Sequence, residues 1–297
     1  MDIWIPVIFL CLSTTIGLVS LWQYNRRQLE NARLSSQQTL VNCALLVSLI
    51  NHLQQHRGMS SAWLSGDLSF QVRREEKARQ IQEMFTALGD LARAEGMQVC
   101  PCLTPNDWAL FRHQWRELVD KLPTLAVEQS IARHSHLISK LLEWLAAIGE
   151  ARIEPLAVDQ TMIGSARNFT HRLPLLTECL GQARAIGSSV AAQKSCPPVA
   201  RVRLLFLISR AESLLEQAVA AHDVGSETLR AQQAIRQMIS TVRTRMLFSS
   251  GVVVTSSEYF SLATDAIDRV FTWVHACEEE TRRFMVGNKP EMRLHTC

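Results

Sequence analysis

The stretch LINHLQQHRGMSSAWLSGD, residues 49–67, has the spacing of apolar and small side chains that is typical of one face of an α-helix. Arg57 falls on that face, in line with Leu49, Leu53, Ser60, Ser61 and Leu64. Arginine rarely occupies the middle of an apolar face, because burying its charge is costly unless an anion accompanies it. The stretch therefore predicts a buried helix that carries an unusual cation.

A second stretch, LPLLTECLGQARAIGSSVAAQ at residues 173–193, repeats this arrangement around Arg184. Small or hydroxylated side chains follow each arginine, so two such helices could pack closely and leave a small polar pocket. One interpretation is a structural ion pair in each case, with Glu178, Glu212 and Glu216 as internal partners. The other is a bound anion. A guanidinium fork suits a planar oxyanion such as nitrate or nitrite, and the hydroxyls of Ser61 and Ser188 could add donors.

The whole chain has the composition of a helical protein. Of its 297 residues 47% are hydrophobic, and only 12 are glycine and 9 are proline, which indicates few turns and a sizeable core. Helical periodicity, proline positions and capping residues predict an all-α fold of antiparallel bundles with about eight helices outside the membrane. The expected ranges are 28–65, 69–96, 105–121, 125–150, 156–194, 199–221, 226–249 and 256–286. Four tryptophans are expected to fill the bundle cores: Trp108, Trp115, Trp144 and Trp273.

The N-terminus predicts a membrane anchor over residues 1–25. No charge occurs from Ile3 to Asn25, which is long enough for a bilayer core, and no basic segment precedes the apolar run as in a cleaved signal peptide. The single span is followed by a basic segment, residues 26–34, that contains Arg26, Arg27 and Arg33. The positive-inside rule then places the body on the cytoplasmic side of the inner membrane, with a periplasmic body as the alternative.

Several function classes lack their sequence signals. Net charge is +3, from 31 basic and 28 acidic residues, which is too balanced to indicate nucleic-acid binding. Glycine-rich phosphate loops, nucleophile elbows and paired metal-binding histidines do not occur. His134 and His136 point in different directions on a helix and are expected at the surface or the edge of the core. The eight cysteines are expected to be reduced. We therefore expect no enzyme activity, no cofactor and no metal.

Three segments resemble the nitrate- and nitrite-sensing (NIT) domain family. LQQHRGMSSAWLSG and LTECLGQARAIGSSVAA are similar to its two arginine motifs, and SSEYFSLATDAIDRV is similar to its final helix. The resemblance covers about residues 35–285. It implies bundles that share long helices, a sensor domain over residues 35–286, and nitrate or nitrite bound by Arg57 and Arg184. The tail at 287–297 is expected to be loose. Where the family often has acidic residues before the two arginines, this chain has His56 and Ala183.

Together with the predicted anchor, the resemblance predicts a membrane-anchored sensory protein that binds nitrate or nitrite between bundle helices and signals through a partner protein of unknown identity. A homodimer fits this function. Three further basic candidates on the next-to-last helix, for which a solvated face is the alternative, are Arg236, Arg243 and Arg245. The rival hypothesis is a helical scaffold of a membrane complex that has no small-molecule ligand.

Overall fold

The computed structural model describes residues 23, 37–157, 159–221, 225–247 and 251–287. The expected anchor (residues 1–25, apart from Gln23), the basic segment 26–34 and residues 288–297 of the tail lie outside this part of the chain. Within the described ranges, no helix is both long enough and apolar enough to cross a membrane.

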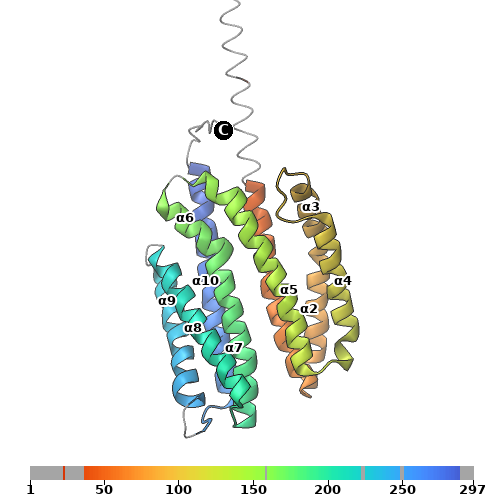
Figure 1. Ribbon diagram of the computed structural model, residues 1–297, viewed down its shortest axis with the longest axis vertical. Helices are drawn as coiled ribbons and strands as arrows, with labels where there is room; N and C mark the ends of the chain where they lie inside the picture. The colour runs from red at the N-terminus through yellow and green to blue at the C-terminus, as the bar shows by residue number, and fades with distance from the viewer. Residues whose placement is uncertain (1–22, 24–36, 158, 222–224, 248–250, 288–297) are drawn as a thin grey trace, which may run out of the picture.

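Helices form all the regular structure of the described residues, which confirms the all-α fold. Figure 1 shows two bundles side by side, formed by different helices, whereas the family resemblance implied bundles that share long helices. The first bundle contains the N-terminal helix (residues 37–64), α2 (Gln71–Glu83), α3 (Phe85–Gly96), α4 (Pro105–Lys121) and α5 (Val127–Ile148). The second contains α6 (Gln160–Arg167), α7 (Leu173–Gln193), α8 (Pro198–Ala220), α9 (Ser226–Thr241) and α10 (Ser256–Gly287).

Local capping signals explain which helix boundaries the sequence predicts well. Helix α4 has the expected bounds, because Thr104 and Asp107 form a reciprocal capping box and Pro105 opens the first turn. The expected helix 69–96 is instead two helices that meet at Met84. The expected range 156–194, which Pro155 was expected to open, also has a wrong start. Residues 154–156 form a 3₁₀ turn, and α6 begins at Gln160 after Asp159, whose carboxylate accepts the Met162 N–H at 2.8 Å.

Helices α6 and α7 run on through a π-helical turn, η5 (Asn168–Arg172), that stands just before Pro174. Proline lacks the backbone N–H and crowds the carbonyl one turn earlier, so a wider turn at this point lets the helix continue. The Thr177 hydroxyl donates to the Pro174 carbonyl oxygen at 2.7 Å. This continuity carries the second arginine motif straight down the middle of the molecule (Figure 1).

The core contains the four predicted tryptophans, all of which are buried. Trp108 stacks on Phe111 with 5.2 Å between ring centroids, and Phe85 meets Trp108 edge to face. Trp273 lies on α10 in the second bundle. The prediction that these side chains fill the bundle cores is therefore confirmed.

Gly149 allows two turns of the chain, η3 (Gly149–Ile153) and η5, to pack closely against each other. It opens the π-helical turn η3 after α5, and a Cβ atom built on it would lie 2.2 Å from the Thr170 hydroxyl oxygen of η5. No real Cβ approaches an oxygen that closely, so the two backbones could not keep this distance with any larger residue.

We predict that Gly149→Ala lowers the free energy of unfolding by about 1–3 kcal/mol, because the added methyl group overpacks this contact. Gly89→Ala is the matched control. A Cβ there meets only the Trp108 ring, at 3.4 Å and beyond, and alanine favours the helix, so stability should hold or rise slightly. Chemical denaturation of the two variants measures the difference. Equal stability would show that the close contact does not exist.

Candidate functional site

The N-terminal helix and α7 meet at the two arginines that the sequence singled out. A Cβ atom on Gly181 of α7 would lie 2.7 Å from Arg57 Nη2, and one on Gly58 would lie 3.5 Å from Arg184 Nη2. Each arginine thus packs over a glycine of the opposite helix. Only 1% of Arg57 and 9% of Arg184 is exposed, so this helix crossing buries two guanidinium groups.

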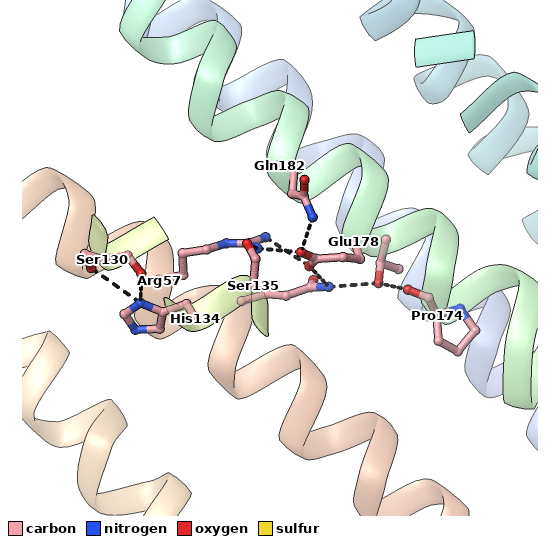
Figure 2. A network of polar contacts seen from close by, with 9 residues as sticks. Arg57, Ser130, His134, Ser135, Pro174, Glu178 and Gln182 are labelled. Carbon is pink, nitrogen blue, oxygen red and sulfur yellow. Dashed lines mark hydrogen bonds and ion pairs between the residues drawn. The ribbon is translucent and has the colours of Figure 1, made fainter. Parts of the chain in front are cut away.

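Arg57 forms a bidentate ion pair with Glu178 of α7 (Figure 2). The two bonds measure 2.6 Å from Nη1 to Oε1 and 3.1 Å from Nη2 to Oε2. Arg57 Nη1 also donates to the Ser135 hydroxyl of α5 at 2.7 Å. Of the three glutamates considered from the sequence, Glu178 is the one that neutralises Arg57. The ion-pair interpretation is therefore correct for the first arginine.

Two glutamines complete the surroundings of the Glu178 carboxylate. Gln182 Nε2 donates to Oε1 at 2.8 Å, and Gln54 Nε2 donates to Oε2 at 3.1 Å and also contacts the Thr177 hydroxyl at 3.1 Å. Each carboxylate oxygen therefore accepts one guanidinium and one amide N–H. Sequence reasoning missed both glutamines, although Gln54 lies one turn before Arg57 and Gln182 one turn after Glu178.

Arg184 has no such partner. Among the described residues no carboxylate oxygen lies within 4.0 Å of its guanidinium group, whose Nη1 donates to the Thr264 hydroxyl of α10 at 2.9 Å. The group also lies 5.0 Å from the centre of the Phe260 ring. Burial, and then the positive charge of Arg57, lower the pKa of Arg184 to about 10, while Asp268 acts in the opposite direction. Arg184 is therefore still a cation at neutral pH, and a poorly neutralised one.

The two serines of the predicted site differ in their bonding. Ser61 donates its hydroxyl to the Arg57 carbonyl oxygen at 2.9 Å, within its own helix. The Ser188 hydroxyl oxygen, one turn after Arg184, is buried and has no hydrogen-bond partner among the described residues. Tyr259 closes this side of the site, because its hydroxyl donates to the Ala183 carbonyl oxygen at 3.0 Å. An acceptor could still bind at Ser188.

The three further basic candidates lie on the outside of the second bundle. Arg243 makes a bidentate ion pair with Glu212 of α8, with bonds of 2.7 and 2.6 Å, and Arg245 pairs with Glu258 of α10. Arg236 is exposed. These positions favour the solvated-face interpretation. No group of three or more metal-binding side chains in the described ranges is placed to hold an ion.

A buried histidine pair lies beside the crossing, and here the sequence expectation for His134 was wrong. His134 is fully buried, and its Nε2 lies 2.8 Å from His56 Nδ1. Burial keeps both rings neutral, so His134 Nδ1, which lies 2.7 Å from the Ser130 carbonyl oxygen, donates to it and His134 Nε2 accepts from His56. Trp115 meets His56 edge to face at 5.0 Å. The sequence around His134 did not predict its burial, because its partner His56 is 78 positions away.

Burial, the largest cause, lowers the pKa of His134 to about 3 and holds the pKa of His56 well below its usual range. In the unfolded chain the two histidines become protonated near pH 6.5, whereas in the folded protein they stay neutral at that pH. The stability they contribute is therefore present above that pH and is lost as the pH falls below it.

We predict that the free energy of unfolding falls below pH 6.5 by about 1.4 kcal/mol per pH unit for each of the two histidines. His134→Gln should remove roughly half of this slope in urea titrations between pH 7 and pH 5. His136→Gln is the control, because His136 is exposed on the same helix. The pairing would be refuted if the two variants had the same slope.

Comparisons with known proteins give a matching family model and a similar solved structure. The family model described as "Nitrate and nitrite sensing" matches residues 48–280, which include both arginines. The solved "Structure of the NasR transcription antiterminator" has 18% sequence identity and a TM-score of 0.70, and the match covers 91% of this chain and 75% of that chain. This likeness shows the fold alone. No curated protein matches the chain. Because the family model covers most of its length, the chain belongs to the nitrate- and nitrite-sensing (NIT) family.

Proposed function

We propose that this protein binds nitrate or nitrite at the crossing of the N-terminal helix with α7, with Arg184 as the primary contact and Arg57 beside it. The observation that carries the proposal is the charge of Arg184. It is a buried cation that no described carboxylate contacts. A buried charge without a counter-ion costs several kcal/mol, and a monovalent anion would remove that cost.

The chemistry of the surrounding groups suits a small planar oxyanion. The Arg184 guanidinium can bind two oxygens side by side, and the Thr264 hydroxyl already lies 2.9 Å from its Nη1. The buried hydroxyl of Ser188 is free to donate to a third oxygen. Nitrate has three such oxygens in one plane, and nitrite has two.

Signalling would follow from the position of the site. Arg57 comes from the first bundle, whereas Arg184 and Thr264 come from α7 and α10 of the second. An anion that contacts both bundles would favour one packing of these helices over another, and a two-state shift of this kind is enough to signal. We propose that a partner protein senses the shift, that residues 1–25 anchor the chain to the inner membrane with a cytoplasmic body, and that the chain is a homodimer.

The rival function is a helical scaffold without a ligand. It is supported by the Arg57–Glu178 ion pair, since a carboxylate of the protein already neutralises that arginine. The scaffold hypothesis has no direct ion pair of this kind for Arg184, which Asp268 influences only without contact. Nitrate binding distinguishes the two functions.

We predict that the full-length protein in detergent binds nitrate in isothermal titration at millimolar concentrations or below. Arg184→Ala should weaken binding about tenfold or more, because it removes charge-assisted hydrogen bonds worth about 1.5–3 kcal/mol each. Arg243→Ala is the matched control: Arg243 is an arginine of the same chain that is exposed and paired with Glu212.

Circular dichroism confirms that each variant is folded before titration. If the wild-type protein shows no nitrate or nitrite heat at millimolar concentration, the ligand proposal is wrong. If Arg184→Ala binds as tightly as Arg243→Ala, the ligand binds at another site.

A further inference from the structure

The carboxylate of Glu178 has the surroundings that a bound planar oxyanion would need. The carboxylate is a planar group, and its two oxygens accept four N–H hydrogen bonds from Arg57, Gln54 and Gln182. The three side chains come from two helices, so this oxyanion cradle exists only where the helices cross (Figure 2). The O–N–O edge of nitrite or nitrate has nearly the same shape as the O–C–O edge of a carboxylate.

We propose that Glu178 is an internal competitor of the ligand: its carboxylate occupies the cradle of Gln54, Arg57 and Gln182, and it sets how tightly the protein binds nitrate or nitrite. This inference rests on the proposed function and adds the residue that determines affinity.

The orientation of Gln54 indicates that the cradle is organised around an anion. Its amide nitrogen donates to both Thr177 and Glu178, while its amide oxygen is buried and has no hydrogen-bond partner among the described residues. Leaving a buried acceptor unpaired costs about 1–3 kcal/mol. This orientation of the amide leaves Gln54 Oε1 unpaired, and it directs the N–H groups toward the negative charge of Glu178.

The charge balance at the crossing explains why Glu178 competes. Arg57 and Arg184 are both buried, and Arg57 acts on the pKa of Arg184, so the two cations are electrostatically coupled. Glu178 supplies one negative charge to this pair and uses Arg57 Nη1 and Nη2. An anion from solution must therefore either displace this carboxylate from Arg57 or bind at Arg184 against its repulsion. Both routes weaken binding as long as Glu178 is charged.

Glu178→Gln in the full-length protein tests the inference, because the amide keeps the shape of the carboxylate and removes its charge. We expect the variant to unfold at a lower temperature than wild type without nitrate, since Arg57 then lacks its counter-ion. Nitrate should raise its Tm more than it raises that of wild type, and its nitrate Kd should be about tenfold lower. Chloride at equal ionic strength controls for screening.

Glu212→Gln is the matched control. Glu212 also forms a bidentate pair with an arginine, Arg243, but this pair is exposed on α8. The control should have the nitrate affinity of wild type. If Glu178→Gln does not fold, Glu178→Asp replaces it, because the shorter side chain loosens the contact with Arg57 and should also tighten nitrate binding.

The outcomes separate this inference from the function on which it rests. If wild type binds nitrate and neither Glu178 variant binds it more tightly, the inference is wrong and nitrate binding stands. If only the Glu178 variants bind, the competitor is real and the native chain is not a nitrate sensor. If no form of the protein binds nitrate, both proposals are wrong.

Discussion

The buried ion pair between Arg57 and Glu178 is the interaction on which the meeting of the two bundles depends. It connects the N-terminal helix of the first bundle to α7 of the second, and both side chains are almost completely buried. Removing one partner of such a pair leaves a charge without compensation and typically costs about 3–5 kcal/mol. The bundles can approach closely enough for this contact because Gly181 provides no side chain that would block Arg57.

The two arginines at the crossing differ in how well their charges are neutralised. Arg57 is bonded to the Glu178 carboxylate and the Ser135 hydroxyl, whereas Arg184 has a hydroxyl and an aromatic ring. A fold built only for stability would not bury a cation in this way. The same feature would be useful in a sensor, because a buried site that lacks one negative charge would select a small anion, and its occupancy would alter contacts made by both bundles. The histidine pair beside it, neutral and fully buried, adds no further charge to the site.

Much of the fold was predictable because its signals are local. The capping box before α4 and the prolines before α8 fix helix starts within a few residues. The break at Met84 was missed because the helical pattern continues on both sides of it. Which helices form which bundle was not predicted, because no short stretch of sequence encodes it. The two arginines were found because an arginine on an apolar face is unusual wherever it occurs.

The partners of these arginines were harder to predict. Which glutamate reaches Arg57 depends on how the N-terminal helix is rotated against α7, and that rotation is set by packing over the whole interface. The same reason explains why Gln54, Gln182 and the His56–His134 pair escaped notice, since glutamines and histidines are common on helix surfaces and acquire a role only through a distant neighbour.

We propose that Arg184 lacks a carboxylate partner because its partner is an anion from solution. A crystal structure of the full-length protein grown with nitrate tests this most directly. We expect a planar anion hydrogen-bonded to the Arg184 guanidinium at the crossing of the N-terminal helix with α7. A carboxylate of the protein bonded to Arg184, with no anion at the crossing, would contradict it.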